Sequence, residues 1–473
     1  MTNPPNKLLE GPILRSLLAL AVPIAFANVL QAAYQLIDAF WVGRLGGSAV
    51  AAVSVSTPIM FLTIAIGAGL AIAGSTLVAQ YYGARNTDMV DHVAAQTLLM
   101  VVVVSVVLGS VGYVVSPMLL RLMGVGADVY KGAIGFMRVS FVGLVFNFFF
   151  FMFQSLMRGV GEAKLPVFIV FGTVVLNFIL DPLFIFGYGP VPAMGVMGAA
   201  VATVGTQSLA ALIGLAVLLG GRYGIHLAWR DFKPDIVYIK RAFLLGLPAS
   251  IEQSARALGL TVLTFLIASF GTLTMAAYGV GSTVLQVVVI PAMGLSMAIS
   301  ALVGQNIGAG NVDRAAQIGR LGSWLGFWIL TALGAVAFLF ASQIVAFFVP
   351  HDPGVIAEGA TYLRTMALSW GFLGAQFSMT GVLRASGNMV MTMVLTLVSQ
   401  WVLQFPLAYV LSEHTTLGAR GIWWAFPISY LLIALVTAGV YAKGDWKKKR
   451  LVGAEDTLRE RVANEITIEE GGR

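Results

Sequence analysis

Long uncharged apolar stretches recur along almost the whole chain, and they limit its fold more than any other feature. Each is at or above the roughly 18–25 residues that an α-helix needs to cross a hydrocarbon layer about 30 Å thick. Of 473 residues, 58% are hydrophobic and 10% are charged, against roughly 45–50% and about 25% in soluble domains. We therefore expect an all-α polytopic membrane protein, in contact with the lipid bilayer along most of its length, and not a soluble enzyme.

The apolar runs, read together with turn residues and charges, predict twelve transmembrane helices. The first run continues to about residue 43 and lacks the short apolar core and cleavage site of a signal peptide, so it is expected to be a retained helix. The expected spans are 15–43, 49–82, 90–117, 129–157, 164–187, 194–220, 240–270, 274–307, 312–340, 353–383, 388–412 and 418–442.

Positive charges lie mostly between these runs, and their distribution sets an orientation. If both termini are cytoplasmic, only Arg44, Arg121, Lys131 and Arg420 fall in the loops on the opposite side. Cytoplasmic loops carry the excess of Lys and Arg, so we expect a multi-pass protein of the inner (cytoplasmic) membrane with both termini inside. Because the charges flank membrane helices, the net charge of +7 does not indicate nucleic-acid binding.

The second half of the chain repeats the first. A shift of 225 residues places "VAQYYGARNTD" (78–88) on "VGQNIGAGNVD" (303–313), and Pro23 on Pro248. A shift of 226 residues aligns "LMRGVG" (156–161) with "VLRASG" (382–387). Each unit has six spans, an even number, so the two halves share one topology. Parallel six-helix repeats are a transporter architecture in which substrate binds between two lobes.

The repeat divides the chain into five parts. The last part begins after the final span and contains the basic "WKKKR", which is expected to attract anionic lipid or, alternatively, to act as a stop-transfer anchor. The parts are a cytoplasmic N-terminus (1–14), an N-terminal lobe (15–220), a cytoplasmic linker (221–239), a C-terminal lobe (240–442) and a cytoplasmic tail (443–473).

One acid, Asp38, lies two-thirds along the first predicted helix. Ionisable groups deep in apolar helices cost about 2.5–3.5 kcal/mol each on insertion scales, so they are candidates for function. Gln31, Tyr34 and Gln35 precede Asp38 by seven, four and three residues. These spacings put all four side chains on one helical face.

Two further polar stripes follow in the same half. Asp181 in the fifth span has Asn177 and Thr173 at four-residue intervals before it. In the second repeat, the region opposite has Gln404 and no acid, and Leu263 stands opposite Asp38. The polar site is therefore expected in the N-terminal lobe alone. The sixth span completes it with Thr203, Thr206 and Gln207.

The interpretation of Asp38 and Asp181 is a proton or cation site. Burial favours the neutral form of a carboxyl, so that protonation becomes usable near neutral pH. The alternative is a structural carboxylate satisfied by neighbouring hydroxyls and amides. A second alternative, for Asp181 before Pro182, is a helix-end residue among the headgroups.

The seventh span carries Glu252 and Arg256, spaced i,i+4 with the acid first, the favourable order for an ion pair. A neutralised structural pair and a gating or substrate contact both remain open. Pro23 interrupts the first helix some four turns before Asp38, as a hinge or as a static kink.

Residues and motifs that several kinds of chemistry require are absent from the sequence. The chain has no cysteine, which excludes disulfides and thiolate metal sites. It has no phosphate-binding loop and no HExxH motif, so ATP-driven transport and metal catalysis are without support. We expect no catalytic residues, no cofactor and no metal other than a coupling ion, H⁺ or alternatively Na⁺ at Asp38 and Asp181.

Several motifs together resemble those of the multidrug and toxic compound extrusion (MATE) transporters over residues 10–442. They are "LAVPIAFANVLQAAYQLIDAFWVGRLG", the pair "VAQYYGARN" and "VGQNIGAGN", "LMRGVGEAKLP", and "NFILDPLFIFG" with "GVMGAAVAT". The resemblance implies a V-shaped, two-lobed bundle that exports organic cations and amphipathic drugs in exchange for H⁺ or Na⁺. By motif, Asp38, Asn177, Asp181 and Thr203 resemble the cation-site residues, and Pro23 resembles the proline whose helix bends on protonation.

Within the family the chain resembles the DinF-like branch, for which proton coupling in the N-terminal lobe is the usual proposal. The expected function is proton-coupled antiport by alternating access, carried out by a monomer. One rival is a flippase for lipid-linked precursors, which predicts a strongly cationic cavity, whereas Arg256 is the one deep cation expected here and has an acid partner. A second rival is a receptor or channel scaffold, which does not need a duplicated core.

Overall fold

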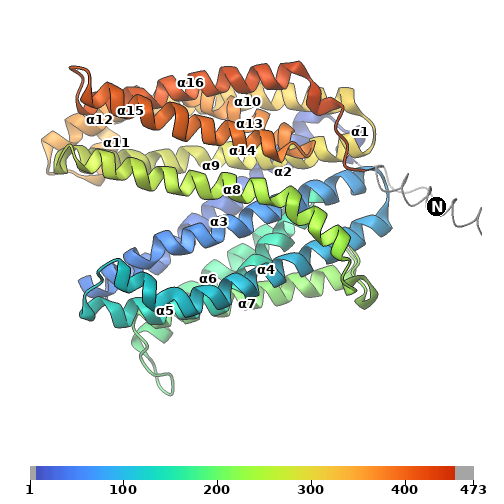
Figure 1. The fold of residues 1–473 in the computed structure, drawn as a ribbon, viewed down its shortest axis with the longest axis horizontal. Helices are drawn as coiled ribbons and strands as arrows, with labels where there is room; N and C mark the ends of the chain where they lie inside the picture. Colours follow the sequence, from blue (N-terminus) through green and yellow to red (C-terminus); the bar gives the residue numbers. More distant parts are fainter. Residues whose placement is uncertain (1–6, 453–473) are drawn as a thin grey trace, which may run out of the picture.

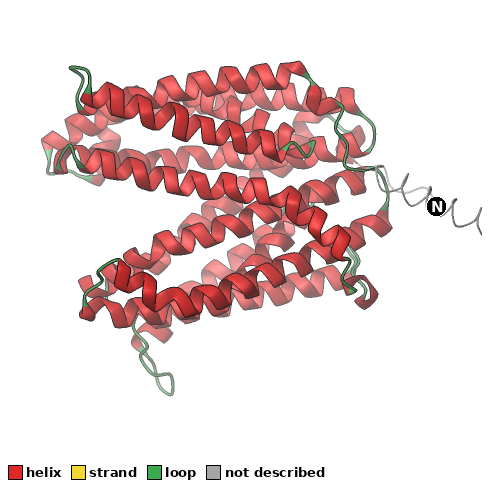
Figure 2. Ribbon diagram, in the orientation of Figure 1, coloured by secondary structure: helices red, strands yellow, loops and turns green. Residues whose placement is uncertain are grey.

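The structure of the chain, a computed structural model, describes residues 7–452. Helices make up almost all of this part (Figure 2), and the described residues contain one isolated β-bridge, between Tyr188 and Val191, and no longer strand. Residues 1–6 of the expected N-terminal segment and 453–473 of the expected tail lie outside the described residues.

The helices follow the predicted spans closely. In the first half they are α1 (Lys7–Glu10), α2 (Ile13–Gly43), α3 (Gly47–Gly83), α4 (Thr87–Leu122), α5 (Ala127–Gly159), α6 (Lys164–Phe186) and α7 (Val196–Gly220), with η1 (Trp229–Phe232) in the linker. In the second half they are α8 (Ile236–Ala268), α9 (Thr272–Gly308), α10 (Val312–Leu339), α11 (Ala341–Phe348), α12 (Pro353–Ala367), α13 (Trp370–Ala385), α14 (Met389–Leu397), η2 (Val398–Gln404), α15 (Phe405–Glu413), α16 (Ala419–Lys443) and η3 (Asp445–Lys447).

Local sequence explains where several helices begin. The Asn86 side chain accepts a hydrogen bond from the backbone N–H of Met89 at 3.1 Å, which caps α4. Asp235 caps α8 in the same way, accepting from Tyr238 N–H at 3.0 Å. Such caps satisfy backbone donors that have no partner within the helix.

Among the described residues, eleven helices are long and apolar enough to cross a membrane. The remaining predicted span, 353–383, the tenth in chain order, is present as two shorter helices, α12 and α13, which meet at Leu368 and Ser369. Ser369 Oγ donates to Met366 O at 2.8 Å, and its N–H bonds the same carbonyl. The bond from the Ser369 N–H reaches three residues back, as in a 3₁₀ turn, so the four-residue pattern of the α-helix is interrupted at this point.

The helices form two lobes whose ribbons meet at the end where α1 lies and diverge towards the other end (Figure 1). This is the V-shaped bundle expected from the sequence. One large core gathers buried residues of α2 to α7, and a second gathers those of α8 to α16 at the end where the ribbons diverge. A third cluster fills the end where the lobes meet.

The first helix of each repeat packs on both lobes. In α2, Leu17 and Ile24 are buried against α9 of the second half, whereas Leu30 and Val42 belong to the core of the first half. Helix α8 does the reverse: it begins in the core of the first half and ends, at Leu263 and Ile267, in that of the second. The two lobes are therefore tied together by crossing helices.

Where the lobes meet, the contacts obey the sequence repeat. Gln80 Nε2 donates to Ala385 O at 2.7 Å, and its repeat partner Gln305 donates to Gly159 O at 2.8 Å. Gly83, the last residue of α3, leaves no room for a Cβ beside the backbone carbonyl of Gln305, and Gly308 of α9 leaves none beside that of Gln80. Glycine is needed at these two positions because two helix ends approach each other there.

Candidate functional site

The three polar stripes expected in the first half lie together, because α6 packs between α2 and α7. Asp38 projects from α2. Asn177 and Asp181, four residues apart on α6, share one face of that helix. Thr203 and Thr206 project from α7.

One side-chain amide joins the two acids. Asn177 Nδ2 donates to Asp38 Oδ1 at 2.5 Å and to Asp181 Oδ2 at 3.0 Å. Thr203 Oγ1 donates to the other oxygen of Asp38 at 3.2 Å. The two carboxyl groups therefore lie on either side of a single amide nitrogen.

Tyr34 holds that amide in place. Its hydroxyl donates to Asn177 Oδ1 at 2.8 Å and lies 2.5 Å from Thr206 Oγ1. Tyr34 is 3% exposed. Because Oδ1 of Asn177 receives the tyrosine proton, the amide nitrogen faces the acids.

Burial differs between the two acids. Asp181 is completely buried and its Oδ1 has no hydrogen-bond partner, whereas Asp38 is half-buried. Asp181 lies one turn before the end of α6 at Phe186, yet its side chain points into the protein and not to a helix end open to headgroups. A buried carboxylate oxygen without a donor is costly, and Asp38 lies within hydrogen-bond reach of Asp181, so a proton on one of the two acids lowers this cost.

The other predicted supporting residues do not join the network. Gln35 is exposed, and Gln31 is half-buried. Thr173 Oγ1 donates to Val170 O within its own helix at 2.7 Å. Gln207 is buried with Oε1 unpaired. The helical face shared with Asp38 correctly placed Tyr34 in the cluster. It did not distinguish Tyr34 from Gln31 and Gln35, which share that face but stay outside the network.

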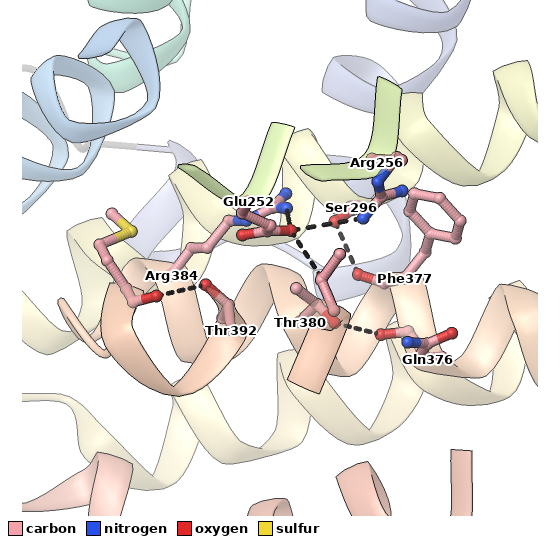
Figure 3. A network of polar contacts seen from close by, with 10 residues as sticks. Glu252, Arg256, Ser296, Gln376, Phe377, Thr380, Arg384 and Thr392 are labelled. Atoms are coloured by element: carbon pink, nitrogen blue, oxygen red, sulfur yellow. Dashed lines mark hydrogen bonds and ion pairs between the residues drawn. The ribbon is translucent and has the colours of Figure 1, made fainter. Parts of the chain in front are cut away.

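A second polar cluster lies in the second lobe around Glu252 (Figure 3). The predicted partner Arg256 donates from Nη2 to Glu252 Oε1 at 3.3 Å, and its guanidinium lies over the Phe377 ring. Arg384 of α13 approaches the same oxygen at 2.5 Å, and Thr396 of α14 donates to it at 3.2 Å. Glu252 is completely buried.

Arg384 was missed by the sequence analysis. Its place in "VLRASG" suggested a loop residue, and Arg256 was expected to be the one deep cation; the structure shows that this was wrong, because Arg384 is 8% exposed. Arg384 corresponds to Arg158 of "LMRGVG" and, like it, stands directly after a predicted span, so the repeat gave no indication that it would contact Glu252. The cluster is one acid with two arginines, so a single-pair description left out half of its positive charge.

Pro23 lies within α2, directly before Ile24, the last α2 residue in the cluster shared with α9. Pro248 holds the corresponding place in α8. A proline removes one backbone hydrogen bond from a helix interior and weakens it there. Each crossing helix therefore has its weak point where it passes from one lobe to the other.

In the part of the chain that the structure describes, no group of three or more His, Cys, Asp or Glu side chains could hold a metal ion. In the first lobe, the oxygen atoms that come together are those of the two acids and of the Thr203 and Tyr34 hydroxyls.

Known proteins match this chain over most of its length. The MatE family model matches residues 23–183 and 248–410, one segment in each repeat. The probable multidrug resistance protein YoeA of Bacillus subtilis is 31% identical over 443 residues, 92% of this chain and 95% of the relative. The probable multidrug resistance protein NorM of Thermotoga maritima is 25% identical over 443 residues, 94% of this chain and 95% of its own.

Solved structures agree. An outward-facing multidrug resistance MATE family transporter of the MOP superfamily superimposes with a TM-score of 0.86 at 25% identity, covering 95% of this chain and 100% of the other. A MATE crystal structure in complex with MaL6 gives a TM-score of 0.88 at 25% identity with the same coverage. With both repeats matched and a relative 31% identical over nearly all of its length, the chain belongs to the MatE family of membrane transporters and is not an enzyme.

Proposed function

We propose that this transporter is a secondary active multidrug exporter that exchanges H⁺ for organic cations and other amphipathic drugs by alternating access. Relatives named as multidrug resistance proteins support the substrate class. We further propose that it works as a monomer in the inner membrane with both termini cytoplasmic, and that it belongs to the DinF-like branch. In that orientation the ribbons diverge towards the outside.

The observation that carries the proton proposal is the amide nitrogen of Asn177 between Asp38 and Asp181. Two carboxylates side by side in a buried place repel each other, and the pair is more stable when one holds a proton. The two carboxyl groups also lie within hydrogen-bond reach of each other, so one proton held between them replaces their repulsion by a hydrogen bond, in addition to the two bonds from the amide. This arrangement favours H⁺ over Na⁺ as the coupling ion.

The crossing of α2 suggests how protonation reaches the rest of the molecule. Asp38 lies in the half of α2 that packs in the first lobe, and Pro23 separates it from the half that packs on α9. Adding a proton removes the charge that Asn177 and Thr203 stabilise and so loosens α2 from α6 and α7. A ligand shifts such an equilibrium only through its different affinity for the two states, and the carboxyl pair supplies that difference for H⁺.

The test is efflux of a fluorescent organic cation from proteoliposomes under an imposed pH gradient or an imposed Na⁺ gradient. The wild type is expected to respond to the pH gradient. Asp38→Asn is expected to fold normally and to lose at least about tenfold in pH-driven efflux, a free-energy change of about 1.4 kcal/mol. The control is Asp128→Asn, an exposed acid in the first turn of α5.

The rivals predict different results. Normal pH-driven efflux by Asp38→Asn contradicts the assignment of the coupling site. Efflux driven by Na⁺ alone indicates Na⁺ at the same pair. Translocation of a lipid-linked pyrophosphate without drug efflux indicates the flippase.

A further inference from the structure

The chain continues beyond the last transmembrane helix as a short segment, residues 445–452, that lies across the end where the two lobes meet. Its first part is anchored to the second half. Trp446 is 1% exposed, its ring stacks on Tyr441 at 5.5 Å, and its Nε1 donates to Tyr441 O at 3.1 Å. We call residues 445–452 the C-terminal strap.

The far end of the strap is bound to the first half. The backbone N–H of Leu451 donates to Gln80 Oε1 at 2.7 Å. Val452 is 7% exposed and belongs to the core of the first lobe. Between the two anchors, Arg450 Nη2 donates to Gly308 O at 2.5 Å. Eight residues therefore connect both lobes at their meeting point.

The strap breaks the twofold pattern of the lobe contact. Gln80 and Gln305 make equivalent hydrogen bonds across the interface through Nε2, and both side chains are completely buried. Gln80 also uses Oε1, which accepts from Leu451. Oε1 of Gln305 is buried and has no partner. Leu8 of α1 lies against Gly161 beside Gln305, as Leu451 lies against Gly387. Among the described residues, only the strap adds a backbone N–H, so Gln80 Oε1 is satisfied and Gln305 Oε1 is not.

We propose that the C-terminal strap is a latch that holds the lobes together through Gln80 and has to detach before they separate at this end. Separation removes Ala385 O from Gln80 Nε2 and, with the strap in place, also strains the bond from Leu451. Since Trp446 stays with the second half and Val452 with the first, a bound strap opposes any motion that parts them. The latch regulates the alternating access proposed above and rests on that proposal.

The test measures lobe separation directly. The chain contains no cysteine, so spin labels can be placed at Asp88→Cys and Asp313→Cys alone, two exposed repeat-equivalent residues in the first turns of α4 and α10. Electron–electron double resonance in nanodiscs then gives the distance distribution between the lobes. Leu451→Pro removes the N–H that binds Gln80. We expect it to raise the ratio of separated to closed lobes about fivefold, the effect of one buried hydrogen bond.

Two further variants control the experiment. Lys449→Ala changes an exposed strap residue whose N–H makes none of the bonds above, and it is expected to leave the distribution unchanged. Arg450→Met keeps every backbone donor, so it folds independently of proline effects, and it is expected to shift the distribution in the same direction as Leu451→Pro.

A wild-type distribution in both Leu451→Pro and Arg450→Met overturns the latch. An equal shift in Lys449→Ala also overturns it, because the effect then belongs to any change in the strap and not to the Gln80 contact. The measurement does not use transport. A wild type without proton-driven efflux therefore refutes the proposed function while the latch is still judged on its own.

Discussion

At the scale of single residues, the two lobes carry opposite kinds of polar cluster. In the first lobe, two acids share one amide donor and leave Asp181 Oδ1 without a partner. In the second lobe, one acid receives two guanidinium groups and a hydroxyl. The first cluster has no positively charged side chain, so a proton has to neutralise its acids. In the second cluster, the two arginine side chains already balance the acid.

The second cluster has a measurable consequence for stability. Glu252→Gln removes the charge that balances Arg256 and Arg384, leaving two arginines in a largely buried place. Removing one partner of a buried ion pair typically costs about 3–5 kcal/mol. We expect a melting temperature in detergent clearly below that of the wild type.

A double variant separates charge imbalance from loss of shape. Glu252→Gln with Arg384→Met removes one arginine of the unbalanced set, so part of the lost stability is expected to return. If the double variant melts no higher than Glu252→Gln, the cluster does not act through charge balance.

At the scale of helices, the meeting of the lobes depends on close approach between the ends of α3 and α9. Gly83 faces the backbone carbonyl of Gln305, which cannot rotate away as a flexible side chain does. A methyl group there has to push two helix ends apart. The repeat gives the same relation between Gly308 and the carbonyl of Gln80.

We therefore expect Gly83→Ala to shift the lobes towards separation at this end, and Gly308→Ala to do the same. The label pair at residues 88 and 313 reports both. Gly205→Ala in α7 is the matched control, since a Cβ there meets nothing within 4 Å. Equal distance distributions in Gly83→Ala and Gly205→Ala contradict this account of the interface.

At the scale of the whole molecule, the crossing of α2 and α8 means that neither repeat covers its own core. Tyr238 and Ala242 of α8 complete the core of the first half, and Leu17 and Ile24 of α2 are buried against the second. An isolated first half leaves these surfaces without their partners.

We expect a fragment of residues 1–233 to aggregate when expressed alone and to form a stable complex when co-expressed with 234–473. Co-purification followed by thermal unfolding measures this, with the intact chain as the reference. A fragment 1–233 that is monodisperse and melts as high as the complex shows that the crossing helices are not needed for the core of the first half.

Much of the architecture could be read from the sequence. The length of the apolar runs predicted the membrane and the spans, because a bilayer imposes a minimum helix length. The match of Gln80 with Gln305 predicted two parallel halves. The helical faces of Asp38 and Asp181 also predicted Tyr34 and Asn177 beside them, since helix periodicity fixes which residues share a face.

The tertiary structure decided which faces meet. Arg384 is 132 residues from Glu252, and Leu451 is 371 residues from Gln80. In a membrane helix the face towards lipid and the face towards another helix are both apolar, so hydropathy cannot predict which helices contact each other. Thus the sequence alone determined the membrane, the repeat and the acids of the first lobe. Only packing determined the amide that joins those acids, the second arginine of Glu252, the crossing of α2 and α8, and the strap that binds Gln80.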